Sequence, residues 1–380
     1  MPVPELAHVP ADVPVAVVLG GPSAEHDVSI VSGSAIADSL AADGYPVETW
    51  CIDLAGDWWR LPDGFRRDGR PQAAYDDPAV LGAEGPMDAG VAIERLADRP
   101  VRPVVFLALH GPFGEDGTAQ ALCEAAGLVY TGSGVAASAI GMDKAIFKRL
   151  IRGMGLPLVD WVEVRAGRWA RERGAVLAEL DGFAAEGGDP RLMVKPARLG
   201  SSLGMAIAHG ADEREAAIDA AFAFDDVVLV ERYLAGARDI EVSVIGNDPT
   251  ALELYGPGEI HSGHEFYDYT AKYTPGLSTT TIAAAVDTAT ADRIRRLAGE
   301  TYAATGCEGF ARVDFLLAGE TLVISEINTI PGFTPISLFP TMPASAGYDF
   351  AAVCRRVVDL ALERERGRVR HRLAPGDLPR

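Results

Sequence analysis

Two neighbouring apolar runs carry polar side chains at regular intervals: Phe310-Ala-Arg-Val-Asp-Phe-Leu316 and Leu322-Val-Ile-Ser-Glu-Ile-Asn-Thr-Ile-Pro-Gly-Phe333. Each run alternates in the way that is typical of a β-strand, in which residues two positions apart point to the same face. Arg312 and Asp314 therefore share one face, and so do Glu326 and Asn328. The pattern predicts two strands that carry three oxygen ligands and one arginine.

These side chains have the chemistry of a magnesium-nucleotide site. Mg²⁺ prefers oxygen donors and usually takes few carboxylates together with substrate phosphates, which suits Asp314, Glu326 and the amide of Asn328. The alternative is a pair of half-buried strands whose polar residues simply face solvent. The break at Pro331-Gly332 favours a ligand site, because it ends the strand where backbone N–H groups become free to face a ligand.

The composition is that of a globular protein of two or three domains. The chain has 380 residues, 48% of them hydrophobic, and a net charge of -20, which argues against a nucleic-acid backbone as partner and favours small molecules. The four cysteines lack the spacing of a zinc site or a disulfide framework, so we expect them to be reduced. No basic segment precedes an apolar core at the N-terminus, and no run has the length of a membrane span. We therefore expect a cytoplasmic protein without membrane contact.

Residues 1–138 have the alternating pattern of an α/β domain with a parallel sheet. A strand is expected at residues 14–19, a helix at residues 23–40, and further strands that end near Asp53, Leu109 and Thr131. Ligands of such sheets lie beyond the carboxyl ends of the strands. The loops that begin at Gly20 and His110 are therefore candidate binding loops.

Acidic segments in these two loops have both a structural and a functional interpretation. Glu25 lies at the first turn of the expected helix, where it could favour the helix dipole or hold an ammonium group. The segment from His110 to Asp116 is either a tight acidic turn or the wall of a substrate site. Gly132-Ser-Gly-Val-Ala-Ala137 matches GxGxxA, with Asp160 as the ribose ligand, but a dinucleotide site would lie nearer the N-terminus and would leave the strand ligands unused.

The second half of the chain contains a candidate phosphate loop. Gly200-Ser-Ser-Leu-Gly204 follows a strand that ends in Lys195, so its backbone could approach a phosphate while the lysine supplies a charge; an ordinary turn is the alternative. No GxxxxGK[ST] motif occurs, so the loop is not of the Walker A type. Residues 255–280 have no strong period and are expected to form a long lid loop. The arginines from Arg364 onwards are expected on a solvated surface.

Taken together, the motifs resemble the D-alanine:D-alanine ligases of the ATP-grasp superfamily. The matching segments occur in order between about Val15 and Leu338, and they are Leu19-Gly-Gly-Pro-Ser-Ala-Glu25, Leu109-His-Gly-Pro-Phe-Gly-Glu-Asp-Gly117, Thr131-Gly-Ser-Gly134 with Met142-Asp-Lys144, Lys195-Pro196 with Gly200-Ser-Ser-Leu-Gly-Met205, Phe266-Tyr-Asp-Tyr-Thr-Ala-Lys-Tyr273 and Glu326-Ile-Asn-Thr-Ile-Pro-Gly332. The resemblance implies an N-terminal parallel-sheet α/β domain (residues 1–138) followed by a two-lobed, α+β ATP-grasp fold (residues 139–236 and 237–380).

The resemblance also implies an ATP site between the two lobes. Lys144 and Lys195 would contact phosphates, Glu231 and Leu234 the adenine, Asp239 the ribose and Lys272 the γ-phosphate. Relatives more often have Glu where this chain has Asp239. Asp314, Glu326 and Asn328 would hold two Mg²⁺ ions, with Mn²⁺ as a substitute.

The implied reaction joins two D-alanines through an acyl phosphate, with release of ADP and phosphate, for peptidoglycan precursors. Glu25 would hold the first ammonium with the help of Ser201 and Tyr273, and Arg312 with the Gly332 N–H would stabilise the oxyanion. His110, Ser337 and Leu338 would meet the second substrate, and residues 264–275 would close as a lid. D-lactate or D-serine as the second substrate, and a nucleotide-binding relative without turnover, stay as alternatives. Relatives are commonly homodimers, so we expect one here.

Overall fold

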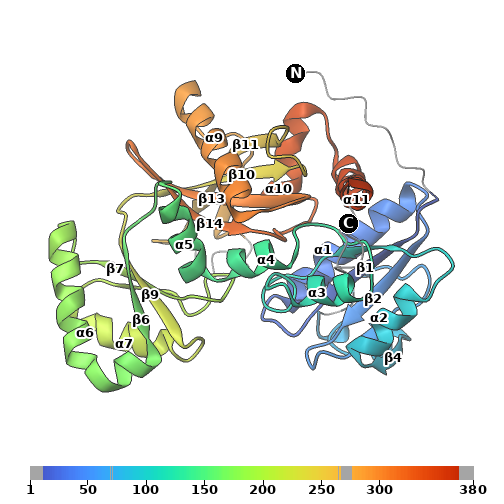
Figure 1. Cartoon of the computed structure of the whole chain (residues 1–380), viewed down its shortest axis with the longest axis horizontal. Helices are drawn as coiled ribbons and strands as arrows, with labels where there is room; N and C mark the ends of the chain where they lie inside the picture. The colour runs from blue at the N-terminus through green and yellow to red at the C-terminus, as the bar shows by residue number, and fades with distance from the viewer. Residues whose placement is uncertain (1–11, 69, 71, 264, 267–275, 368–380) are drawn as a thin grey trace, which may run out of the picture.

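The computed structural model describes residues 12–68, 70, 72–263, 265, 266 and 276–367, which form three sheets flanked by helices. The expected Lys272 and Tyr273 lie outside these described residues. In Figure 1 the N-terminal sheet lies at the right, the second sheet at the lower left and the third sheet above and between them.

The N-terminal sheet has the order β4-β3-β2-β1-β5. Its strands are β1 (Val15–Gly20), β2 (Val47–Ile52), β3 (Trp58–Arg60), β4 (Glu84–Met87) and β5 (Val104–Leu107), and its helices are α1 (His26–Ala42), α2 (Ala89–Ala97) and α3 (Thr118–Ala125), with the short 3-10 helices η1 (Gln72–Ala74) and η2 (Pro78–Leu81). β1 pairs in parallel with β2 and β5, whereas β3 and β4 add an antiparallel edge that the sequence did not predict.

Every residue of β1 is buried, because helices pack on both faces of the sheet. Val15 and Val17 belong to a core cluster that contains Ile36 of α1, while Ala16 and Val18 pack on the opposite face with α2 and α3. The expected strand at residues 128–131 is reduced to a single parallel bridge between Val105 and Tyr130.

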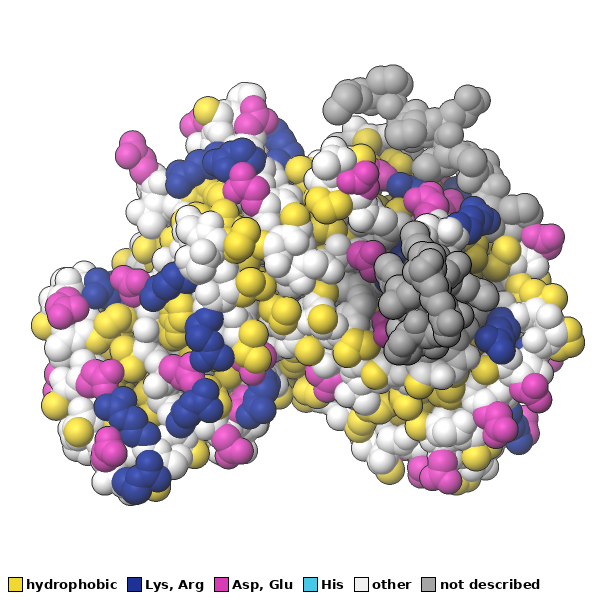
Figure 2. Space-filling model, in the orientation of Figure 1, with side chains coloured by type: hydrophobic (Ala, Val, Ile, Leu, Met, Phe, Trp, Pro, Cys, Tyr) yellow, Lys and Arg dark blue, Asp and Glu magenta, His cyan; other side chains and the backbone are white. Residues whose placement is uncertain are grey.

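The second sheet has the order β6-β9-β7-β8, and all its pairs are antiparallel. Its strands are β6 (Trp161–Arg165), β7 (Leu192–Pro196), β8 (Ala206–Ala208) and β9 (Val227–Arg232), preceded by α4 (Val135–Met142) and α5 (Lys144–Gly153) and covered by α6 (Ala166–Gly187) and α7 (Ala211–Ala221). The outer surface of this lobe mixes basic with acidic side chains (Figure 2). Pairs such as Arg168 with Glu179, 2.7 Å apart, are exposed and add little stability.

The third sheet has the order β12-β11-β10-β13-β14 and is antiparallel throughout. Its strands are β10 (Arg238–Ile245), β11 (Glu253–Ser262), β12 (Ser278–Thr281), β13 (Phe310–Ala318) and β14 (Thr321–Asn328), and its helices are α9 (Thr288–Thr305), α10 (Leu338–Thr341), η3 (Met342–Ala346) and α11 (Phe350–Gly367). From Val313 on, β13 alternates between buried apolar residues and partly exposed ones, as its sequence predicted. The alternation places Arg312 and Asp314 on the face opposite to the core of this lobe.

Two expectations about the second half need correction. Residues 253–262 and 278–281 form β11 and β12, so the aperiodic segment is shorter than the expected loop at residues 255–280. Arg364 in α11 is buried rather than solvated, because α11 packs against α1 and β5 of the N-terminal part. Within the described part of the chain, no helix combines the length and apolar character needed to cross a membrane.

Candidate active site

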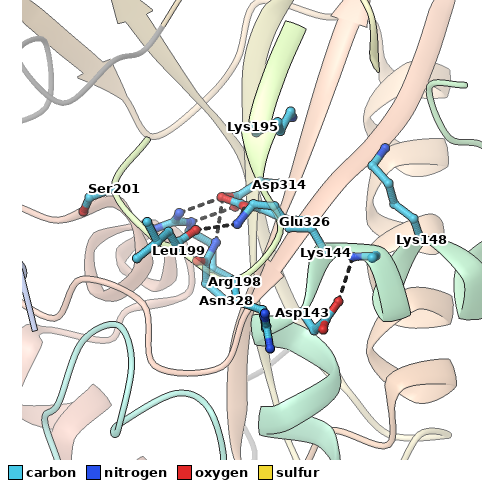
Figure 3. A network of polar contacts seen from close by, with 12 residues as sticks. Asp143, Lys144, Lys148, Lys195, Arg198, Leu199, Ser201, Asp314, Glu326 and Asn328 are labelled. Atoms are coloured by element: carbon cyan, nitrogen blue, oxygen red, sulfur yellow. Dashed lines mark hydrogen bonds and ion pairs between the residues drawn. The ribbon is translucent and has the colours of Figure 1, made fainter. Parts of the chain in front are cut away.

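The predicted ligand residues come together where β13 and β14 pair. Arg312 lies opposite Asn328 and Asp314 opposite Glu326 in the register of the two strands. The Arg312 guanidinium donates from Nε to Asp314 Oδ1 and from Nη2 to Asp314 Oδ2, each at 2.7 Å, and Asn328 Nδ2 donates to Asp314 Oδ2 at 2.8 Å. Figure 3 shows Asp314, Glu326 and Asn328 gathered at one point. Strand alternation predicted the shared face within each strand, and the pairing of β13 with β14 brings the two faces together. The role of these residues as metal ligands stays a prediction.

The donor set fits a divalent cation that also uses phosphate oxygens. Among the described residues, no three His, Cys, Asp or Glu side chains cluster as metal ligands, so a closed protein cage is not formed there. Two carboxylates and one amide are nevertheless what Mg²⁺ takes when substrate phosphates and water complete its shell. The pairing of β13 with β14 is irregular between Asp314 and Phe315, directly after the pair of Asp314 and Glu326. Such β-bulges often lie beside active sites.

Arg312 keeps a permanent positive charge beside these carboxylates. Its Nε lies 3.2 Å from Glu241 Oε1 in addition to the two bonds with Asp314. Burial alone would lower the pKa of Arg312, but the charges of Asp314 and Glu241 raise it well above its ordinary value. The guanidinium can therefore neutralise negative charge that develops nearby.

Lys144 connects the ligand group to the candidate phosphate loop. Asp143 caps α5 by accepting from Ala145 N at 3.0 Å and Ile146 N at 2.9 Å, which places Lys144 in the first turn. Lys144 Nζ donates to the Leu199 carbonyl at 2.7 Å and lies 3.2 Å from Glu326 Oε2. One lysine thus reaches both the loop and a metal-ligand candidate.

The phosphate loop after β7 has a backbone that few residue types tolerate. Ser201 and Ser202 have φ values of 50° and 56°, in the left-handed region that L residues rarely adopt. Arg198 N donates to Asp225 Oδ2 at 2.7 Å, and the guanidinium of Arg198 pairs with the same carboxylate. This clamp at the base of the loop holds the strained turn in place.

Glu25 packs directly against the loop from the N-terminal part. Ser201 Oγ donates to Glu25 Oε1, and a Cβ added to Gly200 would meet Glu25 Oε2 at 2.5 Å. A side chain at position 200 would therefore push the carboxylate away. The expected pair of Glu25 and Ser201 is in direct contact. Glu25 lies just before α1 of the N-terminal part, whereas Ser201 lies in the loop after β7 of the second sheet.

Lys195 and Glu231 form the opposite wall of the cavity. Lys195 Nζ lies 2.8 Å from Glu231 Oε2, and Lys148 Nζ lies 2.8 Å from Glu231 Oε1. Burial alone would raise the pKa of Glu231, but the two ammonium groups lower it to about 2. Glu231 is therefore ionised at all physiological pH values.

These residues line one cavity of about 1150 Å³, including its open mouth. Its wall contains most of the predicted nucleotide and metal residues, together with apolar side chains that could accept a flat ring: Lys144, Met193, Lys195, Ser201, Glu231, Leu234, Asp239, Ile240, Arg312, Asp314, Phe315, Leu316 and Glu326. Charged side chains that could meet phosphates and apolar side chains that could meet a base therefore line the same cavity.

His110 and Glu115 join the N-terminal part to the segment after β14. His110 Nδ1 lies 2.9 Å from the Ile330 carbonyl, which makes Nδ1 the protonated nitrogen, and Nε2 then accepts from Ser32 Oγ at 3.0 Å. Burial lowers the pKa of His110, so the ring is neutral. Glu115 accepts from Gly111 N at 2.9 Å and from Ile330 N at 3.0 Å. Sequence reasoning placed Glu115 in an acidic turn but did not foresee this bridge.

The segment after β14 places the remaining predicted residues. Ser337 Oγ accepts from Thr334 N at 3.2 Å and lies 3.4 Å from where a Cβ on Gly332 would be. The Leu338 side chain packs in a small cluster with Ile260 and Met342. A contact between Leu338 and a substrate would therefore fall to its backbone.

The comparisons with known proteins agree with this geometry. The family model described as D-ala D-ala ligase N-terminus matches residues 14–133, and the one described as D-ala D-ala ligase C-terminus matches residues 150–359. A D-alanine:D-alanine ligase of Kineococcus radiotolerans is 40% identical over 373 residues, which cover 93% of this chain and 97% of the relative. That of Heliobacterium modesticaldum is 40% identical over 376 residues, which cover 96% and 98%.

Solved structures give the same result. The D-alanine:D-alanine ligase from Coxiella burnetii superposes with a TM-score of 0.74 at 28% identity, over 93% of this chain and 96% of that one. The VanG D-Ala:D-Ser ligase from Enterococcus faecalis superposes with a TM-score of 0.76 at 29% identity, over 92% and 99%. The chain therefore belongs to the D-alanine:D-alanine ligase family.

Proposed function

We propose that this chain joins two D-alanines into D-alanyl-D-alanine with ATP, releasing ADP and phosphate, for peptidoglycan precursors. The observation that carries the proposal is the single cavity in which Lys144, Lys195, Asp314 and Glu326 meet, with Glu25 in contact with its Ser201 wall. A carboxylate resists attack by an amine, because its negative charge repels the nucleophile and oxide leaves poorly. Phosphorylation of the first carboxylate supplies a leaving group.

The nucleotide would lie between the second and third sheets. Lys144 and Lys195 would neutralise phosphate oxygens, because phosphoryl transfer depends mainly on positioning and charge cancellation. Glu231 and Leu234 would meet the adenine, and Asp239 the ribose. Lys272, the expected γ-phosphate contact, belongs to the residues that the structure does not describe. The division into residues 1–138, 139–236 and 237–380 is part of this proposal.

Family membership implies ATP and a divalent metal, and we propose two Mg²⁺ ions, with Mn²⁺ as a substitute. Asp314, Glu326 and Asn328 are the residues that would hold them. When bound, the metal would neutralise phosphate charge and orient the transferring group. Arg312 would add a fixed positive charge at the same place, since it is bonded to Asp314 in the structure.

The amino acids would lie on the side of the cavity nearest the N-terminal part. Glu25 would hold the first ammonium, with Ser201 and the undescribed Tyr273 fixing the Glu25 rotamer. The second amine attacks the acyl carbon, loses its proton and displaces phosphate, while Arg312 and the Gly332 N–H stabilise the oxyanion. His110, Ser337 and Leu338 would meet the second substrate.

D-serine in the second position is the rival that an observation favours, because one similar solved structure is named as a D-Ala:D-Ser ligase. D-lactate stays as a further alternative. A relative that binds nucleotide without turnover is disfavoured, since Lys195, Arg312, Asp314, Glu326 and Asn328 are all present and the last four meet at the paired strands. We also propose a homodimer on the strength of the family, and a cytoplasmic location, in line with four free and buried cysteines.

The test is ADP release with each of D-alanine, L-alanine, D-serine and D-lactate, with mass spectrometry of the product. D-alanine should give the dipeptide, whereas a faster reaction with a mixture of D-alanine and D-serine would favour the rival. Glu326→Gln should lower ADP release by on the order of 100-fold, since it removes a charged metal ligand. Glu320→Gln, which changes an exposed carboxylate at the turn between β13 and β14, is the matched control. Normal turnover of Glu326→Gln at saturating Mg²⁺ would remove Glu326 from the metal site.

A further inference from the structure

We infer that Lys148 is a positioning residue for nucleobase selection: together with Lys195 it holds the Glu231 carboxylate as a fixed acceptor for the 6-amino group of the base. The inference rests on the proposed nucleotide site. It adds a residue that does not itself line the cavity, whose wall includes Glu231 and Lys195. Lys148 would act from behind that wall, through Glu231.

The geometry of α5 aims two lysines at different parts of the site. Lys144 and Lys148 are one turn apart on α5, and Figure 3 shows the Lys148 side chain leading away from the Asp314 and Glu326 group. Lys144 reaches Leu199 and Glu326, whereas Lys148 reaches Glu231. The Lys148 side chain is only 2% exposed and that of Glu231 only 4%. Because both side chains are shielded from solvent, water could not replace either charge if its partner were removed.

Each oxygen of the Glu231 carboxylate is approached by one ammonium group at 2.8 Å, Oε1 by Lys148 and Oε2 by Lys195. The contact at Oε1 is an ion pair whose direction does not meet the geometry of a hydrogen bond. Oε1 is therefore a buried acceptor without a hydrogen-bond partner among the described residues. Such an atom is costly unless a charge or a donor lies beside it, and Lys148 supplies that charge from behind the wall. The Oε2 side of the carboxylate, next to Lys195, is then left to accept an N–H of a ligand in the cavity that Glu231 lines.

The charge state of the Glu231 carboxylate determines whether a ligand must offer it a hydrogen-bond donor or an acceptor. An ionised carboxylate only accepts hydrogen bonds, whereas a protonated one can also donate. A fixed acceptor favours a base with an exocyclic amino group over one with an exocyclic carbonyl. Burial disfavours the charged carboxylate, and the two lysines oppose this effect. Loss of Lys148 would leave one ammonium group to hold a buried carboxylate.

Lys148 is itself held in one place by two further contacts. Its Nζ lies 3.5 Å from the Val159 carbonyl and 5.2 Å from the centre of the Trp161 ring. A cation over an aromatic face is attracted by the ring. These contacts fix the ammonium group, so that the Glu231 rotamer is set before a nucleotide arrives.

The test compares ATP with purine riboside 5′-triphosphate, which lacks the 6-amino group, by equilibrium titration of the full chain with Mg²⁺ and without amino acids. Wild-type protein should bind ATP at least about tenfold more tightly than the analogue, as one hydrogen bond to a charged group allows. Lys148→Met should weaken ATP binding by about tenfold and leave the analogue within about twofold. A merely structural role would weaken both nucleotides equally, which would overturn the inference, as would an unchanged preference.

Arg149→Met is the matched control, because Arg149 is the next residue of α5 and pairs with Glu163 on the exposed side. It should leave both affinities unchanged. If Lys148→Met does not fold by near-ultraviolet circular dichroism, Lys148→Gln, which keeps a polar but uncharged end on a side chain one atom shorter, takes its place with the same expected result. Failure of the wild-type protein to bind any nucleotide would overturn the proposed function as well, whereas an intact ATP preference in the variant overturns this inference alone.

Discussion

At the scale of single residues, Glu115 ties the loop after β5 to the segment after β14. Its two oxygens accept from the backbone N–H groups of Gly111 and Ile330. Burial and the nearby charge of Glu25 raise its pKa to about 8, against an ordinary value of 4.5. Between these two pH values the folded chain holds a proton that the unfolded chain has lost. The stability of the protein should therefore fall as pH rises through this window and level off above it.

Glu115→Gln should remove this pH dependence, because the amide does not titrate. Denaturant unfolding at several pH values between 5 and 9 measures it. Relative to the variant, the wild-type protein should lose up to about 1.4 kcal/mol of unfolding free energy per pH unit, and less where solvent reaches the carboxyl. Glu94→Gln, on an exposed position of α2, controls for the change in net charge. Parallel curves for wild type and Glu115→Gln would show that Glu115 does not hold the proton.

The residues that sequence reasoning found and those that it missed differ in where their partners lie. Arg312, Asp314 and Glu326 were predictable because strand alternation fixes their faces over a few residues. Glu115 binds Ile330 across a separation of 215 residues, which no local period encodes. Lys148 looked like any polar residue of an amphipathic helix, and only the fold brings Glu231 to it.

At the scale of secondary structure elements, α1 packs on β1 so closely that one helical position must be glycine. A Cβ added to Gly33 would lie 2.5 Å from Leu19 Cβ and 3.3 Å from Ala108 Cβ. Neither neighbour can rotate away, because a Cβ is fixed to its backbone. Gly33→Ala should therefore lower the unfolding free energy by about 1–3 kcal/mol, the usual cost of an overpacked core, although alanine is the better helix former.

Gly182→Ala in α6 is the matched comparison, since nothing lies within 4 Å of its added Cβ. There helix propensity acts alone and should raise the unfolding free energy by about 0.5–1 kcal/mol. Urea denaturation of both variants measures the difference. Equal effects would mean that α1 can shift away from β1 without loss.

The elements that the sequence predicted are those with a strong internal period. The buried run of β1 and the alternating β13 are examples, since their patterns depend on one strand only. The antiparallel β3 and β4 were not foreseen, because both are short and are stabilised by pairing rather than by their own pattern. The sequence predicts a loop where the structure has β12, because Ser278–Thr281 has no apolar alternation and joins the sheet by pairing with β11.

At the scale of the whole molecule, α11 returns from the C-terminal part to the N-terminal one. Val353 and Val357 of α11 share a core cluster with Val15, Val17 and Ile36. The arginines near the C-terminus predicted a solvated surface. The sequence of a terminal helix does not show which part of the protein the helix covers, and so it does not show which arginine is buried. Glu25 and His110 lie in loops that follow β1 and β5 of the N-terminal sheet, so the packing of α11 helps to hold the two residues for which we propose contacts with the amino acids.

Arg364 is the polar contact through which α11 holds the strand-like segment before α4. Its guanidinium donates to the Tyr130 carbonyl at 2.6 Å and to the Gly132 carbonyl, and it lies 4.5 Å from the centre of the Tyr130 ring. Arg364→Leu keeps an apolar stem but leaves both buried carbonyls without their charged donor. It should lower the unfolding free energy by on the order of 3 kcal/mol, because each such bond is worth about 1.5–3 kcal/mol.

Arg366→Leu in the same last turn changes an exposed arginine and should alter stability by less than about 0.5 kcal/mol. Hydrogen exchange should localise the effect of Arg364→Leu, with faster exchange at residues 130–134 and in α11 than in the second sheet. If the two arginine variants had the same stability, or if exchange rose evenly over the chain, α11 would be held by its apolar face alone. The contact between α11 and the N-terminal part would then not depend on the buried guanidinium of Arg364.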